Sequence, residues 1–163
     1  MQINGVAGHG ILDLAANGSR GEHMNTGIEA FDRTLQLTNV WLKDLMTRLG
    51  TEDRHLAYLA LRTTLHALRD RLAVDEAVHL GAQLPMLVRG FYYEGWHPAG
   101  KPVKEHSKEA FLAHVKAEAH ALDFEPEPAA RAVFGLLAER ITAGEIQDVK
   151  GMLPKPIREL WPA

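Results

Sequence analysis

The chain has no cysteine among its 163 residues. This absence excludes disulfides, zinc–thiolate sites, iron–sulfur clusters and thiol nucleophiles, and a cytoplasmic location is expected because the fold needs no oxidising compartment. No apolar run approaches the roughly 20 residues that span a bilayer. No stretch has the basic start, apolar centre and small-residue cleavage site of a secretory signal. We therefore predict no association with a membrane.

Concentrated positive charge and candidate nucleophiles are also scarce. The net charge is −3 with no polybasic tract, so no nucleic-acid partner is expected. The only serines are Ser19 and Ser107, and neither lies in a Gly-x-Ser-x-Gly motif. There is no glycine-rich phosphate loop. We predict no catalytic residue and no cofactor, and we favour a non-enzymatic protein over an enzyme.

No stretch alternates apolar and polar residues at period two, so the sequence predicts no sheet. Apolar residues instead recur every three or four positions between breakers, which predicts helices. The first covers about 26–49, with Phe31 and Leu35 on its apolar face. The pairs Thr26–Glu29 and Thr142–Glu145 have capping-box spacing. The second helix is expected after Thr51, the third covers about 75–83, and the fourth starts at Pro85. The fifth follows Ser107, the sixth starts near Pro128, the seventh follows Thr142, and the last ends at Trp161.

The second half of the chain repeats the first at an offset of 69 positions. Identical residues at this offset are Arg62 and Arg131, Leu68 and Leu137, Arg71 and Arg140, Glu76 and Glu145, Leu84-Pro85 and Leu153-Pro154, and Arg89 and Arg158. We therefore expect an all-α fold in which two related four-helix repeats, 24–96 and 107–163, pack with pseudo-two-fold symmetry. Residues 97–106 form a Pro/Gly linker. Residues 1–23 are interpreted as a flexible leader or an expression-derived segment.

The polar residues that recur are interpreted as structural ion pairs between the repeats. An anion site at the pseudo-two-fold axis is the alternative. These residues are Arg62, Arg71, Glu76, Arg89, Arg131, Arg140, Glu145 and Arg158. By contrast, His66, His79 and Tyr93 have no counterpart, so a site specific to this protein is expected near them.

Metal binding has weak candidates only. Glu52 with His55, and Glu76 with His79, have the Glu-x-x-His spacing of di-iron helical bundles. Asp148 replaces His79 in the second half. Because acids are favoured at helix starts in any case, we interpret these residues as capping acids and surface histidines, and we predict no metal site. His106, His114 and His120 are likewise interpreted as solvated.

Aromatic residues gather at residues 91–96, with the sequence FYYEGW. Core packing explains most of them. Tyr93 and Trp96, together with Trp41 on the first helix, are candidates for a partner-binding patch, because Tyr and Trp are enriched at interface centres.

The run LRDRLAVDEAVHLGAQLPMLVRGFYYEGWHP and its echo AERITAGEIQDVKGMLPKPIRELWP resemble a bacterial family of unknown function, domain family 2267. The similarity covers residues 31–162. It implies an all-helical domain of two related halves, and it brings no reaction or cofactor. From the residues we predict a helical interaction or scaffold module that binds a protein partner or itself. The alternatives are a small-molecule, anion or metal-binding domain with its site between the repeats, and an enzyme of unrecognised type.

Overall fold

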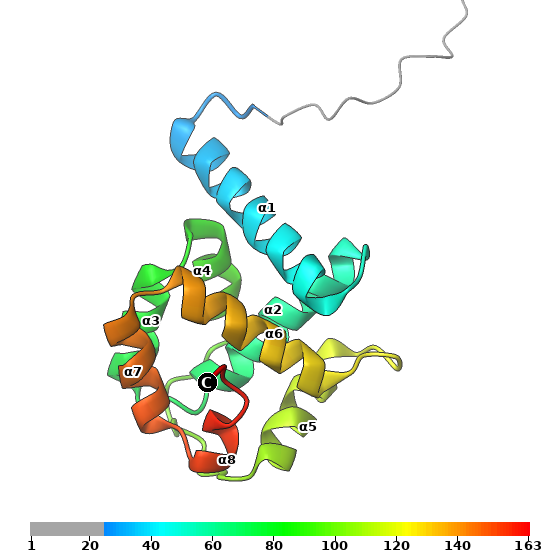
Figure 1. Ribbon diagram of the computed structural model, residues 1–163. Coiled ribbons are helices and arrows are strands. Elements are labelled where there is room, and N and C mark those ends of the chain that lie inside the picture. Colours follow the sequence, from blue (N-terminus) through cyan, green and yellow to red (C-terminus); the bar gives the residue numbers. More distant parts are fainter. Residues whose placement is uncertain (1–24) are drawn as a thin grey trace, which may run out of the picture.

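The computed structural model describes residues 25–163, and this part of the chain is all-helical, with eight helices and no strand (Figure 1). The predictions for residues 1–23 lie outside the described residues. The helices are α1 (Glu29–Leu49), α2 (Arg54–Arg69), α3 (Val74–Gln83), α4 (Met86–Tyr93), α5 (Lys108–Ala119), α6 (Pro126–Arg140), α7 (Ala143–Met152) and α8 (Lys155–Arg158). The expectation of helices without a sheet is confirmed for these residues.

Several helix ends follow from local chemistry. Gly50 ends α1 with a φ of 64°, a left-handed conformation that glycine adopts without steric penalty. The Asp53 carboxylate caps α2 by accepting hydrogen bonds from backbone amides. Ser107 caps α5 as predicted, since its Oγ accepts from the amide of Ala110 at 3.0 Å. The Asp53 and Ser107 caps satisfy backbone amides that the first turn of each helix leaves free.

The first predicted capping box is wrong. The N-cap residue of α1 is Ile28, which makes no side-chain cap. The amide and hydroxyl of Thr26 instead donate to Oδ1 of Asp32, each at 2.8 Å. The chain before α1 is therefore tied to the acid in the first turn of the helix.

The second predicted capping box is also absent. Thr142 occupies the N-cap of α7 but makes no side-chain cap. Its amide and its hydroxyl both donate to Oε1 of Gln83, at 3.1 and 3.2 Å. The start of α7 is thus fastened to the end of α3. A further difference is that α6 begins at Pro126, two residues before Pro128.

The core forms around α2, which packs against α1, α4, α5 and α6. Leu61, Leu65 and Leu68 on α2 are fully buried. Phe134 of α6 bridges this core to the C-terminus, because its ring stacks on Trp161 with centroids 4.2 Å apart. On another flank of the molecule α3 packs against α7 (Figure 1).

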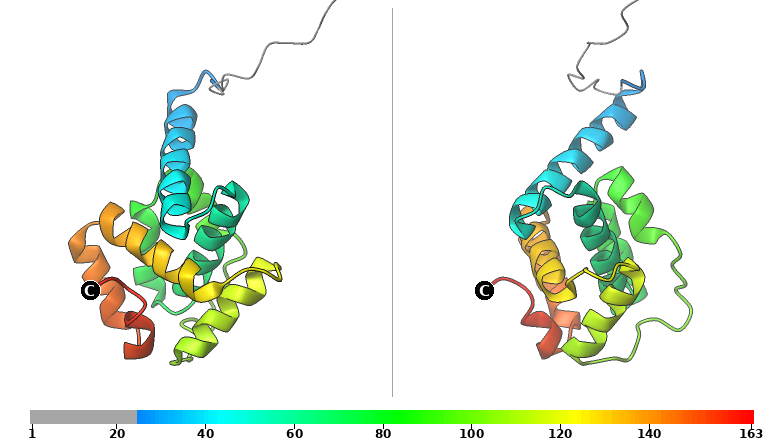
Figure 2. Two further views of the ribbon diagram at one scale, coloured as in Figure 1. Left: turned by 45° about the vertical axis from the view of Figure 1, so that its right-hand side comes forward. Right: turned by 90° about the vertical axis from the view of Figure 1, so that its right-hand side faces the viewer.

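Helix α1 projects from the body, as both views of Figure 2 show. It packs on α2, α6 and α4, and its buried residues are Thr34, Thr38, Trp41, Leu42 and Leu45. The predicted apolar face is therefore only partly a core face: Phe31 is 47% exposed because the first turns of the helix extend beyond the body. Among the helices of residues 25–163, none is long and apolar enough to cross a membrane.

Candidate functional site

The recurring arginines lie in separate places, and four of the six have a carboxylate partner of their own. The ion pairs are Arg62 with Glu94 at 3.6 Å, Arg71 with Glu105 at 2.7 Å, Arg131 with Glu127 at 2.8 Å, and Arg140 with Asp44 at 3.2 Å. The last pair links α6 to α1. This dispersed arrangement holds helices together and does not present several guanidinium groups to one ligand.

Arg89 and Arg158 occupy equivalent positions of the sequence repeat. The Arg89 guanidinium donates to the carbonyls of Gly81, Ala82 and Leu84, at 2.9, 3.3 and 3.0 Å, and so closes the C-terminal end of α3. The side chain of Arg158, at the end of α8, is exposed.

Arg71 is the most deeply buried of these arginines. Its Nη1 donates to the carbonyl of Ala67 at 3.0 Å and lies 3.0 Å from Nδ1 of His114. The guanidinium carbon is 5.1 Å from the ring centroid of Phe111, within cation–π range. Burial lowers the pKa of Arg71, and the carboxylate of Glu105 opposes that shift. Arg71 is therefore a positioned internal cation.

A network of the buried His66 with the half-buried His114 and Glu118 continues from Arg71. Glu118 accepts from Nδ1 of His66 at 2.8 Å and lies 3.1 Å from Nε2 of His114. The other nitrogen of His66 lies 2.5 Å from the carbonyl oxygen of Phe91. A carboxylate and a carbonyl oxygen only accept hydrogen bonds, so each ring nitrogen of His66 faces an acceptor. Nδ1 of His114 faces the Arg71 guanidinium, and its Nε2 faces the Glu118 carboxylate.

The solvated interpretation of His114 is therefore wrong, and Glu118 is a residue that the sequence reasoning missed. The i,i+4 spacing of His114 and Glu118 on α5 was the available signal. Burial alone would raise the pKa of Glu118, but the hydrogen bonds from His114 and His66 outweigh it and hold that pKa well below the usual range. The network joins α2, α4 and α5.

The aromatic candidates are divided between core and surface. Trp41 is 4% exposed and lies in the core. Tyr93 and Trp96 are half-buried, with ring centroids 5.5 Å apart, and the Tyr93 hydroxyl donates to the carbonyl of Val78 at 3.4 Å. Tyr93 thus fastens the end of α4 to α3, and both rings leave only part of their surface to solvent.

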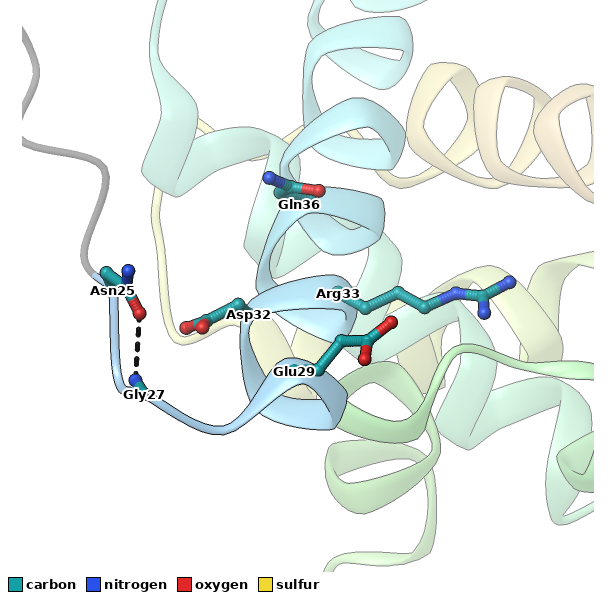
Figure 3. Close-up of a pocket in the computed structure, with 6 residues that line it drawn as sticks. All are labelled: Asn25, Gly27, Glu29, Asp32, Arg33 and Gln36. Atoms are coloured by element: carbon teal, nitrogen blue, oxygen red, sulfur yellow. Dashed lines mark hydrogen bonds between the residues drawn. The ribbon is translucent and has the colours of Figure 1, made fainter.

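A depression surrounds the first turns of α1 (Figure 3). It has a volume of about 680 Å³ and is lined by Asn25, Gly27, Glu29, Asp32, Arg33 and Gln36. In Figure 3, Asp32 and Asn25 lie on one side of the helix, whereas Glu29 and Arg33 lie on the other. The two carboxylates therefore do not converge on one point, as paired acid–base catalysis would require.

The weak metal candidates separate into two groups. Glu52 and His55 are exposed at the start of α2. Glu76 lies on α3 with its carboxylate facing Glu145 and Asp148 of α7, and one ligand atom from each residue lies within 4.8 Å of the others. Nδ1 of His79 is 4.0 Å from Oε2 of Glu76. Burial and the neighbouring Glu76 carboxyl raise the pKa of Glu145 to about 7.

Residues 38–160 match a family described as an uncharacterized conserved protein, DUF2267. The match covers most of the described chain, so the chain belongs to this family, and the resemblance seen in the repeated motifs is confirmed. No curated protein matches the chain. The family description names no activity.

Proposed function

We propose that this member of the DUF2267 family is a non-enzymatic helical interaction module that pairs with a second copy of itself through the projecting half of α1. We also propose that the protein is bacterial and cytoplasmic, and cell fractionation would test its location. The single observation that carries it is an exposed apolar seam on α1.

The seam has the spacing of a helix–helix contact. Ile28, Phe31 and Leu35 are separated by three and four residues, and the same spacing continues to Leu42 and Leu45 in the packed half of the helix. Leu42 and Leu45 are buried against the body, whereas Ile28 and Phe31 are exposed. A second helix placed along the exposed half would continue a contact that the fold already makes.

The start of α4 widens this seam. The amide of Leu87 donates to Oγ1 of Thr34 at 2.9 Å, which places the first turn of α4 beside α1. Both Met86 and Leu87 are exposed large apolar residues. We call Ile28, Phe31, Leu35, Met86 and Leu87 the α1–α4 apolar face. Contiguous exposed apolar surface of this kind marks interaction sites more often than isolated apolar residues do.

A second copy of the chain suits the α1–α4 apolar face because it brings the same unpaired seam. In an isologous dimer each face covers the other, and both exposed seams are removed from water in one contact. An unrelated protein would need to supply a matching apolar helix. The described chain already contains that element.

We also propose that the fold arose by duplication of a four-helix unit, with the two copies packed about a pseudo-two-fold axis. Helix α3 starts at residue 74 and α7 at 143; the two helices end at 83 and 152, so both ends differ by 69. This is the offset of the sequence repeat. The Leu84-Pro85 pair after α3 and the Leu153-Pro154 pair after α7 support the same register.

Sedimentation of the full chain over a range of concentrations tests the self-association. We expect a reversible dimer that Phe31→Asp converts to a monomer. Val40→Asp is the matched control, because Val40 is also 47% exposed and lies nine residues away, about two and a half helical turns and hence on the opposite side of α1.

The two variants separate the outcomes. If Val40→Asp remains a dimer and Phe31→Asp is a monomer, and both unfold at the wild-type temperature, the result supports pairing through the α1–α4 apolar face. A wild-type monomer at all concentrations, or equal loss in both variants, would contradict the proposal. A chain that begins at Met24 shows whether the preceding residues contribute to the pairing.

A further inference from the structure

We propose that Glu76, Glu145 and Asp148 bind a divalent cation of the hard, oxygen-preferring class between α3 and α7. This site is on a different flank from the α1–α4 apolar face, and it does not depend on the proposed self-association.

The fold brings the three carboxylates to one point. Glu76 is in the first turn of α3, and Glu145 is in the first turn of α7. Asp148 lies three residues after Glu145, so both α7 acids face the same side of their helix. One oxygen from each acid lies within 4.8 Å of the other two. Two oxygens on one Ca²⁺ are at most about 5 Å apart, since each bond is about 2.3–2.6 Å.

Unpartnered oxygens point to a missing ligand. Glu76 is only 6% exposed, yet its Oε1 atom has no hydrogen-bond partner within residues 25–163. Oε1 of Glu145 is also buried and also has no hydrogen-bond partner among these residues. Buried polar atoms are nearly always paired, so two such oxygens in one acidic cluster are an unusual arrangement. A cation bound by the cluster would balance the charge that Glu76 carries into the protein.

A shared proton is the alternative to a cation at this cluster. A proton between Glu76 and Glu145 would relieve the repulsion of that pair and could partner one oxygen of each residue. It would nevertheless leave Asp148 without a role, which a cation would not. The amide of Gln83 reaches Oε2 of Glu145 at 3.5 Å, at the limit of a hydrogen bond, and leaves Oε1 untouched.

The donor atoms indicate the class of ion. Three carboxylates offer only oxygen, which suits Ca²⁺, Mg²⁺ and Mn²⁺ better than Zn²⁺ or Cu²⁺. His79 is exposed, and its Nδ1 is 4.0 Å from Glu76, so it can orient that carboxylate without being a required ligand. Asp148 is exposed, so water can complete the coordination shell. We infer a single ion, because the inward-facing carboxylates that a di-iron site needs are not gathered here among the described residues.

Calorimetric titration of the metal-stripped full chain with MnCl₂ and CaCl₂ at neutral pH tests the site. We expect one ion per chain, with Glu145→Gln and Asp148→Asn each weakening the affinity about tenfold or more. Asp75→Asn is the matched control: it removes the same charge from an exposed acid next to Glu76 that lies outside the cluster. Its affinity should stay within about twofold of wild type.

Thermal unfolding with and without Mn²⁺ provides a second readout. The ion should raise the Tm of the wild-type chain and of Asp75→Asn, and at the same ion concentration it should raise the Tm of Asp148→Asn less. Because Asp148 is exposed, that variant keeps the test valid even if Glu145→Gln fails to fold. Two results would overturn the proposal: no saturable binding of either ion at millimolar concentration, or equal weakening by Asp75→Asn and Asp148→Asn.

Discussion

Nδ1 of His66 lies 2.8 Å from the carboxylate of Glu118, across 52 residues of chain. Since the other His66 nitrogen contacts the carbonyl of Phe91 at 2.5 Å, one imidazole ring joins α2 to α5 and to α4. Removing the carboxylate would leave the buried Nδ1 of His66 without its hydrogen-bond partner.

We therefore expect Glu118→Ala to lower the free energy of unfolding by about 1–3 kcal/mol, the usual penalty for an unsatisfied buried donor. Urea unfolding measures this loss. Glu109→Ala, which removes an exposed acid from the first turn of the same helix, should change the stability by under about 0.5 kcal/mol. Equal effects of the two substitutions would show that the network adds nothing beyond α5 helicity.

The stabilisation by Glu118 should depend on pH. The pKa of Glu118 in the folded state is lowered from the ordinary value of 4.5, so the folded chain binds fewer protons than the unfolded chain. The contribution is then fully present above pH 4.5 and is lost as the pH falls below that value. The stability difference between wild type and Glu118→Ala should shrink on acidification. A constant or growing difference would contradict the ion pair.

Gly81 allows α4 to approach α3 closely. A Cβ atom at this position would lie 2.7 Å from Cζ of Tyr93 and 3.0 Å from Cε1 of Tyr92, and Tyr92 is fully buried. We expect Gly81→Ala to destabilise the fold by about 1–3 kcal/mol through overpacking. Thermal or urea unfolding provides the measurement.

Gly90→Ala is the natural comparison for Gly81→Ala. Gly90 is also helical, but a Cβ atom there meets nothing within 4 Å. Alanine is the better helix former by about 0.5–1 kcal/mol, so this substitution should stabilise the chain. Opposite signs for the two substitutions are expected, and two changes of the same sign would refute the packing argument at Gly81.

Gln83 fastens α3 to α7, because its Oε1 accepts from both the amide and the hydroxyl of Thr142. We expect Gln83→Ala to lower the stability by about 1 kcal/mol, as for the loss of a side-chain acceptor at a helix start. Gln147→Ala, at an exposed position of α7, should be neutral. Chemical unfolding of both variants measures the difference. A loss of stability in Gln83→Ala alone shows that the contact between Gln83 and Thr142 stabilises the packing of α3 on α7.

Local sequence patterns predicted the helices well where the determining interactions are themselves local. The serine cap of α5 and the span of α3, expected at about 75–83 and observed as Val74–Gln83, depend on neighbouring residues. The capping boxes failed because Asp32 and Gln83 compete for the hydroxyls of Thr26 and Thr142. Gln83 is 59 residues from Thr142, a distance that no local pattern detects.

The acidic cluster cannot be predicted from sequence patterns alone. The pattern predicts Glu145 as an acid at a helix start, and it does lie in the first turn of α7. Its closeness to Glu76 depends on how α3 packs against α7. The repeat offset already paired these two residues, but a pairing in sequence gives no distance in space. For the same reason Phe31 was expected on a core face although the body ends before it.

The continuity of α1 has a consequence for recognition. The projecting turns share one unbroken hydrogen-bonded helix with the turns that Trp41, Leu42 and Leu45 anchor in the core. Helix nucleation, which is the unfavourable step, is therefore already completed by the folded body. A molecule that docks on the projecting half meets a preorganised surface, and little backbone entropy is lost when the complex forms.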